Sequence, residues 1–267
     1  MSKIALITGG SSGLGFSLAK LLGNQGYQII IIARNKQRID KAIENLAQDK
    51  INASGILCDI TIEEQVKAAA EKIKTDFGKI DFLILNAGEV TPKLLSDYTS
   101  IAILKKDLEI DLWGTIQCTY FFIPLLVEGS KILMTSSGFG IMGAAGYSIY
   151  CAAKAGIVNF AESLRREMLY KKIAVYVTCP GDMNTPQLQY EIANQPEWMK
   201  QNSPRKMMPV DKAAKKILKK CKGYSKFLIL IGSDVKLLAT VTKLLPRKWR
   251  DKLIDSMLPR PKKNSNN

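Results

Sequence analysis

Seven apolar segments of strand length recur along the chain, and segments with the spacing of amphipathic helices separate them. Most of the seven are apolar at consecutive positions, so that both faces of each strand would be buried. Strands of this kind that alternate with helices form parallel sheets covered on both sides. We therefore predict a single doubly wound α/β domain with a seven-stranded parallel sheet and helices on both faces. The segments are KIALIT (3–8), QIIIIA (28–33), SGILCD (54–59), DFLILN (81–86), KILMTS (131–136), AVYVTC (174–179) and KFLILI (226–231).

The composition limits the chemistry that such a domain can perform. The chain has 267 residues, of which 46% are hydrophobic, enough for one substantial core. It contains no histidine, which excludes histidine ligands, histidine bases and Ser-His-Asp triads. We expect no metal site, and proton transfer falls to tyrosine, lysine, carboxylates or thiols. The five cysteines are odd in number with mostly apolar neighbours, so we expect buried free thiols in a reducing compartment.

Charge is distributed unevenly along the chain. The net charge of +15 comes from residues 200–267, which contain 19 basic and 4 acidic side chains. This asymmetry predicts a basic appendage on a neutral body. The chain enters a strand at once, without a long apolar signal region, and no stretch reaches about 18 uncharged apolar residues. We expect a cytoplasmic protein that does not span a membrane.

A glycine-rich turn follows the first strand. The segment TGGSSGLGFSLAKLL places glycines at positions 9, 13 and 15 before an amphipathic helix. Glycines permit a tight turn and a close approach of the backbone to a pyrophosphate, and the start of a helix offers N–H groups and a partial positive charge. The order strand, turn and helix therefore predicts dinucleotide binding over a merely structural turn.

The end of the second strand bears on the type of nucleotide. A site specific for NAD usually has an acidic side chain there for the ribose 2′-hydroxyl, whereas this chain has Arg34. A guanidinium suits a 2′-phosphate, which predicts NADP(H) as the cofactor, with Asn35 and Arg38 as helpers. The alternative is a solvated surface arginine.

A phenol and an ammonium are spaced to share one face of a predicted helix. In SIYCAAKAG (148–156), Tyr150 and Lys154 are four positions apart among small residues that favour a helix. Side chains at i and i+4 face the same way, so the ammonium would pull the tyrosine pKa down from about 10 toward the working range of a general acid or base. The alternative is an amphipathic helix with one packed aromatic and one solvated lysine.

The motifs occur in an order that resembles a known family. After the glycine-rich turn come NAG (86–88), TSS (135–137), Tyr150-x-x-x-Lys154 and PGDMNT (180–185). Together they resemble the short-chain dehydrogenase/reductase family over about residues 3–232. The resemblance implies a Rossmann-type catalytic domain, which we place at residues 1–235, and hydride transfer between a nicotinamide and a ketone or secondary alcohol.

The resemblance also implies roles for individual residues. Tyr150 would donate a proton to the carbonyl oxygen, Lys154 would lower the tyrosine pKa and bind the nicotinamide ribose, and Ser137 would hold the substrate oxygen. The implied cofactor-binding residues are Thr8, Gly9, Ser11, Ser12, Gly13, Leu14, Gly15, Arg34, Asn35, Arg38, Asp59, Ile60, Asn86, Ala87 and Gly88 on the adenosine and phosphate side, and Tyr150, Lys154, Pro180, Gly181, Met183 and Thr185 on the nicotinamide side.

One position departs from the family's pattern. Where the family has asparagine in N-x-x-G-T, this chain reads EIDLWGT, with Asp111. In the family this asparagine helps to hold a water in a proton relay that runs past the lysine. An ionised aspartate accepts hydrogen bonds but cannot donate one. Either the relay survives, which we favour and which keeps Asp111 among the catalytic residues, or the enzyme is slowed or has a shifted pH optimum.

Two segments near the seventh strand bear on the substrate. Residues 186–222 lie where this fold usually covers the substrate, and we predict an apolar lid there; ordinary packing of two helices is the alternative. Residues 236–267 form a basic extension, interrupted at Pro246, that ends in a disordered tail, PRPKKNSNN. Its amphipathic second half fits the interface of an anionic membrane, with docking on the body or in a dimer interface as the alternative. The apolar positions are Leu188, Tyr190, Ile192, Trp198, Met199, Met207 and Met208 in the lid, and Trp249, Leu253, Ile254, Met257 and Leu258 in the extension.

Within the family, TGGSSGLG, ARN, CPGDMNTP and QPEWMK are similar to the 3-ketodihydrosphingosine reductase-like branch. This resemblance implies NADPH-dependent reduction of a long-chain 3-keto lipid such as 3-ketosphinganine, with peripheral contact to a membrane surface. The alternatives are a reductase of small ketones, steroids or xenobiotics, and a non-catalytic NADP(H)-binding sensor or interaction protein. We expect no nucleic-acid partner, because the tail has no recognised binding module and few aromatics. The family commonly forms homodimers or homotetramers through helices corresponding to about 112–127 and 150–170, and we expect one of these states.

Overall fold

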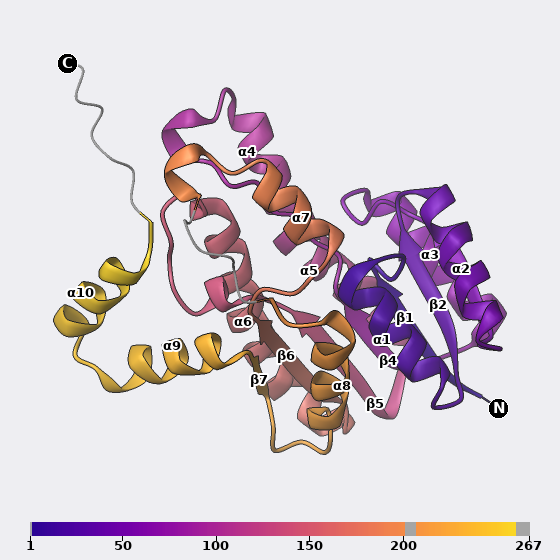
Figure 1. Ribbon diagram of the computed structural model, residues 1–267. Coiled ribbons are helices and arrows are strands. Elements are labelled where there is room, and N and C mark those ends of the chain that lie inside the picture. The colour runs from indigo at the N-terminus through magenta and orange to yellow at the C-terminus, as the bar shows by residue number, and fades with distance from the viewer. Residues whose placement is uncertain (1, 201–206, 260–267) are drawn as a thin grey trace.

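The strands of the computed structural model, which describes residues 2–200 and 207–259, form one parallel sheet (Figure 1). The strands are β1 (Lys3–Thr8), β2 (Tyr27–Ala33), β3 (Ala53–Leu57), β4 (Ile80–Leu85), β5 (Leu126–Thr135), β6 (Ala174–Pro180) and β7 (Leu228–Ile231). Their order is β3-β2-β1-β4-β5-β6-β7. This arrangement confirms the predicted seven-stranded, Rossmann-type sheet. β2 and β3 are added on one side of β1, and β4 to β7 on the other. Folds of this kind bind ligands at the carboxyl ends of the strands where the order switches sides, here between β1 and β4.

β5 begins five residues earlier than the sequence pattern predicts, at Leu126 rather than at Lys131. The polar segment between these residues has the appearance of a turn. In the structure, Ile80 pairs with Leu126 and Phe82 with Lys131, so a bulge absorbs the extra residues. The Ser130 hydroxyl fixes the bulge, because it donates to the Ile80 carbonyl at 2.8 Å. A tertiary contact therefore extends a strand that local pattern alone would have ended.

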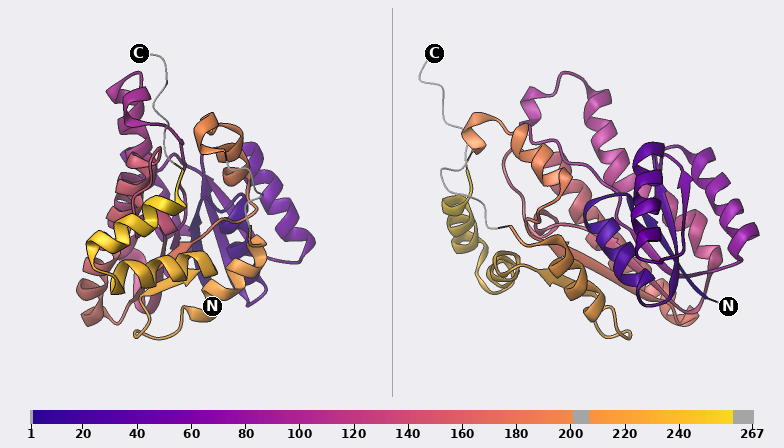
Figure 2. Two further views of the ribbon diagram at one scale, coloured as in Figure 1. Left: turned by 60° about the vertical axis from the view of Figure 1, so that its left-hand side comes forward. Right: turned by 45° about the vertical axis from the view of Figure 1, so that its right-hand side comes forward.

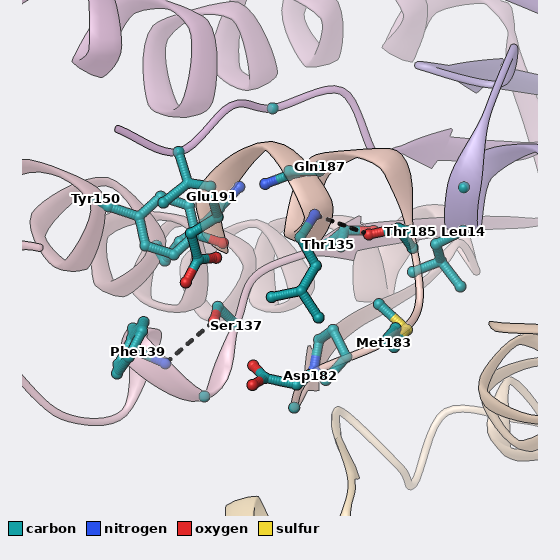
Figure 3. A pocket seen from close by; sticks show the side chains of 18 of the residues that line it. Leu14, Thr135, Ser137, Phe139, Tyr150, Asp182, Met183, Thr185, Gln187 and Glu191 are labelled. Atoms are coloured by element: carbon teal, nitrogen blue, oxygen red, sulfur yellow. Dashed lines mark hydrogen bonds between the residues drawn. The ribbon is translucent and has the colours of Figure 1, made fainter. Parts of the chain in front are cut away.

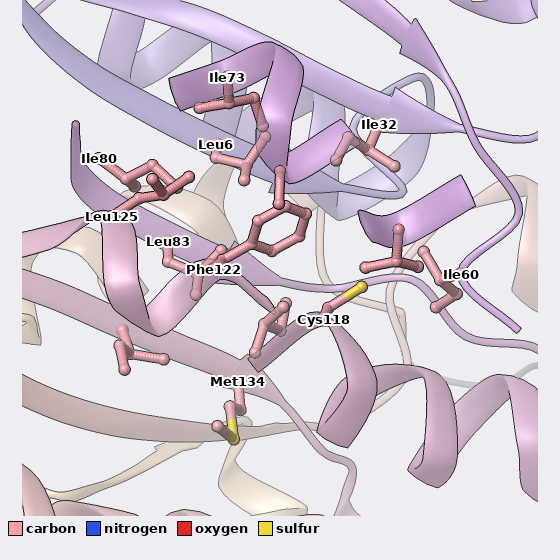
Figure 4. Packing of buried hydrophobic residues seen from close by; sticks show 14 of the residues in the cluster. Leu6, Ile32, Ile60, Ile73, Ile80, Leu83, Cys118, Phe122, Leu125 and Met134 are labelled. Carbon is pink, nitrogen blue, oxygen red and sulfur yellow. The ribbon is translucent and has the colours of Figure 1, made fainter. Parts of the chain in front are cut away.

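Helices cover both faces of the sheet, as predicted (Figure 1). On one face, Leu18 and Ile217 are completely buried against the strands. On the other face, Phe122 is completely buried in the same cluster as Leu83 (Figure 4). The first face is covered by α1 (Gly13–Gly23), α2 (Lys36–Gln48) and α8 (Val210–Lys220), and the second by α3 (Glu63–Phe77), α5 (Gly114–Phe122) and α6 (Ser148–Met168).

Further helices and short helical turns connect these elements or follow β7. They are α4 (Ile101–Leu108), α7 (Pro186–Ala193), α9 (Ser233–Leu244) and α10 (Arg247–Met257), with a π-helical turn, η2 (Glu109–Trp113), and short 3₁₀ turns η1 (Leu95–Asp97), η3 (Ile123–Leu125), η4 (Gly138–Gly140), η5 (Leu169–Lys171) and η6 (Glu197–Met199). α9 and α10 lie beside one another at one end of the molecule, away from α2 and α3 (Figure 2). Pro246 separates them, at the predicted interruption. Residues 201–206 of the predicted lid and 260–267 of the predicted disordered tail lie outside the described residues.

The cysteines are buried free thiols, as predicted. Burial raises the pKa of all five thiols, which keeps them protonated and unreactive at neutral pH. Within residues 2–200 and 207–259, no helix has the length and hydropathy that crossing a bilayer requires.

Candidate active site

A large cavity of about 1430 Å³ lies at the carboxyl ends of the parallel strands (Figure 3). Its lining comes from the turns that follow β1, β2, β4, β5 and β6, and from segments close to β7. Pockets for a drug-sized ligand usually occupy about 300–1,000 Å³. This cavity therefore has room for a dinucleotide together with a second molecule.

The turn after β1 brings the backbone to the cavity. Gly9 has a φ of +65°, in the left-handed region that favours glycine, and a Cβ there would lie 2.9 Å from the Cα of Ala87. A Cβ on Gly15 would collide with the carbonyl oxygen of Gly9, so a glycine at this position lets the first turn of α1 pack closely against the turn after β1. The Ser12 side chain makes no capping hydrogen bond. The first N–H groups of α1 and its dipole therefore fit a phosphate group.

Two residues expected to bind the cofactor, Thr8 and Gly15, do not line the cavity. The Thr8 hydroxyl instead accepts hydrogen bonds from the N–H groups of Asn86 at 3.0 Å and Ala87 at 3.2 Å. It thereby joins the ends of β1 and β4, while Gly15 allows close packing. The other expected cofactor residues all line the cavity: Gly9, Ser11, Ser12, Gly13, Leu14, Arg34, Asn35, Arg38, Asp59, Ile60, Asn86, Ala87, Gly88, Tyr150, Lys154, Pro180, Gly181, Met183 and Thr185.

The arginine at the end of β2 has a partner that sequence reasoning missed. Arg34 forms an ion pair with the carboxylate of Glu89, and both side chains line the cavity. The only sequence signal for Glu89 is its position directly after the NAG motif. Asn35 is the N-cap of α2 and accepts a hydrogen bond from the Arg38 N–H at 2.9 Å. Its side-chain oxygen is therefore already engaged, and Arg34 and Arg38 both bring a guanidinium group to this end of the cavity.

Ser137 and Tyr150 lie at another part of the cavity (Figure 3), which Lys154 also lines. The Ser137 hydroxyl oxygen accepts a hydrogen bond from the N–H of Phe139 at 3.2 Å, which orients it at the end of β5. Tyr150 and Lys154 lie one turn apart on α6, and the Lys154 Nζ is 5.3 Å from the centroid of the tyrosine ring. The structure thus brings the three predicted catalytic side chains together.

Asp111 lies behind this group and does not line the cavity. It belongs to η2 and is only 1% exposed. Its Oδ1 lies 3.5 Å from the Lys154 Nζ and accepts a hydrogen bond from the Glu89 N–H at 2.8 Å. A Cβ on Gly88 would lie 2.5 Å from this oxygen and 2.9 Å from the Lys154 Nζ. Asp111 is therefore placed to position Lys154 and the turn after β4 rather than to touch a ligand.

The pKa of Tyr150 departs from its ordinary value in the direction opposite to the expected one. It is raised well above 10, first because the phenol is buried and second because the Asp111 carboxylate disfavours a phenolate. A hydrogen bond with Ser137 opposes the increase. The expectation that an ammonium one turn away would lower the pKa was wrong for this chain, because it considered Lys154 without the burial and the nearby carboxylate. Burial likewise raises the pKa of Asp111 to about 6, against the opposing effect of Lys154.

The sequence profile of the short chain dehydrogenases matches residues 3–196. The chain belongs to the short chain dehydrogenase family.

Carbonyl reductase family member 4 of Danio rerio is 33% identical over 186 residues, which cover 69% of this chain and 77% of the relative. The fold also matches two crystal structures from Burkholderia. The B. cenocepacia short chain dehydrogenase in complex with NADP has a TM-score of 0.76 and 23% identity over 88% of this chain and 98% of that one; the B. phymatum short chain dehydrogenase/reductase in complex with NAD has a TM-score of 0.80 and 18% identity over 100% and 98%.

Membership in the short chain dehydrogenase family makes the chain an oxidoreductase that uses a nicotinamide cofactor. The residues present fit such a cofactor: the start of α1 suits the pyrophosphate, and basic side chains lie near the end of β2. The bound cofactor supplies or accepts the hydride. The hydroxyl groups of Ser137 and Tyr150 line the same cavity, which is the arrangement needed to hold an oxygen atom and exchange a proton with it.

The predicted lid contributes only in part to the cavity. Its residues Ile192 and Trp198 do not line the cavity; Trp198 packs with Tyr147 and Met199 in a small separate cluster. The lid residues that line it are Leu188, Tyr190, Met199, Met207 and Met208, and side chains that sequence reasoning missed are Phe139, Met142, Tyr147, Leu237 and Leu238. The aromatic member Phe139 stacks on Tyr147 with ring centroids 4.6 Å apart. The substrate end is therefore more apolar than the lid alone predicts.

Proposed function

We propose that this short chain dehydrogenase is an NADP(H)-dependent reductase of ketones, which also oxidises the corresponding secondary alcohols. The observation that supports this most directly is the meeting of Ser137, Tyr150 and Lys154 in one cavity with the first turn of α1. Groups from the turn after β5, from α6 and from the turn after β1 are needed for one reaction, and they converge at the carboxyl edge of the sheet. Such convergence is what a bisubstrate site requires.

In the proposed reduction, Ser137 donates a hydrogen bond to the carbonyl oxygen and Tyr150 transfers its phenolic proton to that oxygen. The hydride adds to the carbonyl carbon, so the product is a secondary alcohol and the phenol becomes a phenolate. Lys154 stabilises the phenolate, and solvent returns the proton. The raised pKa of Tyr150 supports this direction, because it keeps the phenol protonated before the cofactor and substrate bind. Asp111 acts through Lys154 as a positioning residue.

The choice of NADP(H) over NAD(H) rests on Arg34 and Arg38 at the end of the cavity that follows β2. A site for a free ribose 2′-hydroxyl usually has an acidic side chain in this region, whereas these two positions are arginines. A guanidinium forms paired, charge-assisted hydrogen bonds with a phosphate. Glu89 moderates this preference, because it already pairs with Arg34.

For the substrate we propose a long-chain 3-keto lipid such as 3-ketosphinganine. Methionine and leucine side chains of the lid line the cavity, and the flexible methionines adapt to an extended alkyl chain. The resemblance of CPGDMNTP and QPEWMK to the 3-ketodihydrosphingosine reductase-like branch supports the same substrate. The carbonyl reductase name of the Danio rerio relative agrees with the reaction and says nothing of the chain length.

We further propose a cytoplasmic homodimer or homotetramer that makes peripheral contact with anionic membranes. Exposed aromatic residues on or next to the predicted interface helices support the assembly: Tyr120 is 73% exposed on α5, and Tyr170 is 77% exposed just beyond α6. Trp249, 65% exposed on the basic helix α10, supports the membrane contact.

The test follows NADPH absorbance with the purified chain and a panel that includes 3-ketosphinganine and small ketones, with and without vesicles. We expect ketone-dependent oxidation of NADPH that falls by about 10²- to 10⁴-fold in Tyr150→Phe, because this variant lacks the transferable proton. NADPH binding, measured by fluorescence titration, should change little in the variant. Binding of NADPH without turnover of any ketone would contradict the proposal and indicate a non-catalytic sensor.

A further inference from the structure

The C-terminal helices contribute apolar side chains to the same cavity as the catalytic group. Leu237 and Leu238 of α9 line it, and so do Ile254 and Met257 of α10. Leu258, which directly follows α10, continues the lining. The sequence predicted an apolar face with Ile254, Met257 and Leu258, for contact with a membrane or, alternatively, for docking on the body or in a dimer interface. In the structure these three side chains line the cavity that contains Ser137 and Tyr150.

This apolar surface is not packed against the body of the protein. Within Ser233–Leu244, Val235 is the one buried side chain, and within Arg247–Met257 no side chain is buried. A second cavity of about 290 Å³ separates Ile254 from the loop at Met142. Leu237 is 57% exposed and Met257 59% exposed, so this part of the surface is open to solvent. An open apolar surface that borders a cavity is suited to receive an apolar ligand.

Polar and apolar side chains of α10 are divided in a way that fits this role. The Arg247 side chain is 86% exposed, and both Arg247 and Arg250 pair with Asp251 within the helix. Trp249 and Leu253 belong to the same helix but do not line the cavity. Ile254 and Met257 therefore provide the contact with the cavity, while the basic side chains keep the helix hydrated.

We propose that α9 and α10 form the distal wall of the substrate cavity and bind the unbranched alkyl chain of the ketone. This inference rests on the proposed reductase function and adds the element that selects for chain length. The apolar side chain of Met142 belongs to the same cavity lining as Ser137 and Met257, so the ketone end and the chain end of one substrate occupy a continuous space. Flexible leucine and methionine side chains suit a saturated chain better than a rigid ring system.

The experiment measures kcat/KM of the full-length chain for 2-butanone, 2-octanone and 2-dodecanone with saturating NADPH. Burial of each added methylene should raise kcat/KM of the unmodified protein by about three- to fourfold until the wall is covered. The double variant Ile254→Ser, Met257→Ser should lose most of this increase and keep its activity on 2-butanone. Trp249→Ser is the matched control, since it changes an apolar side chain of α10 outside the cavity, and it should retain the increase.

The outcomes separate this inference from the proposed function. If no ketone is reduced by any of the three proteins, the proposed function fails. If all three reduce ketones with the same dependence on chain length, the distal-wall inference alone is overturned. Loss of the dependence in Trp249→Ser as well would also overturn it, because a change outside the cavity would then have the same effect.

Two further measurements distinguish other occupants of this surface. Cosedimentation with vesicles of phosphatidylserine and phosphatidylcholine tests a lipid surface, and size-exclusion chromatography tests a second copy of the chain. If the double variant keeps the chain-length dependence but no longer binds vesicles or no longer associates, the surface belongs to the membrane or to the dimer and the inference is overturned. We expect both properties to be the same in the double variant and the unmodified protein.

Discussion

Two walls of the same cavity are built in opposite ways. On the cofactor side, Asp111 and Lys154 are 1% and 3% exposed, and Gly88 lies against both. On the side formed by the C-terminal helices, no side chain of Arg247–Met257 is buried and Met257 is 59% exposed. Groups that must keep fixed distances for proton transfer are enclosed by dense packing. A surface that we propose receives a flexible alkyl chain is left open and adaptable.

The largest difference between the two regions should appear in stability. Phe122→Ala removes a completely buried ring from the core beneath the cofactor side and should lower the free energy of unfolding by about 3–5 kcal/mol. Leu244→Ala, at a position of α9 that is 71% exposed, should change it by less than about 0.5 kcal/mol. Denaturant unfolding followed by circular dichroism measures both. Similar losses in the two variants would show that the C-terminal helices are packed as firmly as the core.

Activity should show the next largest difference. In Gly88→Ala the new methyl group would lie 2.5 Å from the Asp111 Oδ1 and 2.9 Å from the Lys154 Nζ, so both side chains must move away from it. A displacement of this size should lower kcat/KM by about 100-fold. Gly143→Ala is the control, because a Cβ at Gly143, beside the second cavity near α10, has no heavy atom within 4 Å. Its activity should equal that of the unmodified protein, and an equal loss in both variants would contradict the comparison.

The adenosine end should respond through the charge at the end of β2. Arg34→Ala should weaken NADPH binding by about 10- to 100-fold in a fluorescence titration, because hydrogen bonds to a charged phosphate are lost. NADH binding should remain nearly unchanged. Glu89→Gln is the complementary variant: it releases Arg34 from its ion pair and should tighten NADPH binding by no more than about fivefold. If NADH and NADPH weaken equally in Arg34→Ala, the arginine does not bind the 2′-phosphate.

The smallest effect concerns the pH dependence of alcohol oxidation. The ionised Asp111 raises the pKa of Tyr150, and oxidation requires the phenolate as the base. Asp111→Asn removes this charge, so the acidic limb of the kcat/KM profile should move to lower pH. The pKa of Asp111 is about 6, so below that pH its carboxyl is protonated and the two profiles should converge. Identical profiles throughout would show that the carboxylate has no influence on the proton transfer.

Much of the fold could be predicted from the sequence because its signals are local. Consecutive apolar residues identify buried strands, and the turn at Gly9 and the i, i+4 spacing of Tyr150 and Lys154 depend only on neighbouring residues. The early start of β5 was missed for the same reason, since a contact with Ile80 fixes the bulge. The partner of Arg34 was missed because Glu89 is distant in the sequence.

The sequence by itself therefore determined the sheet, its flanking helices, the glycine-rich turn and the identities of the reactive groups. The tertiary structure alone decided the environment of those groups. Burial and the Asp111 carboxylate raise the pKa of Tyr150, where sequence spacing had predicted a decrease. The tertiary structure also placed Ile254 and Met257 at the cavity, where the sequence had predicted only an amphipathic face. Electrostatic and hydrophobic energies depend on distance and solvent exposure in three dimensions, and residues far apart along the chain set both.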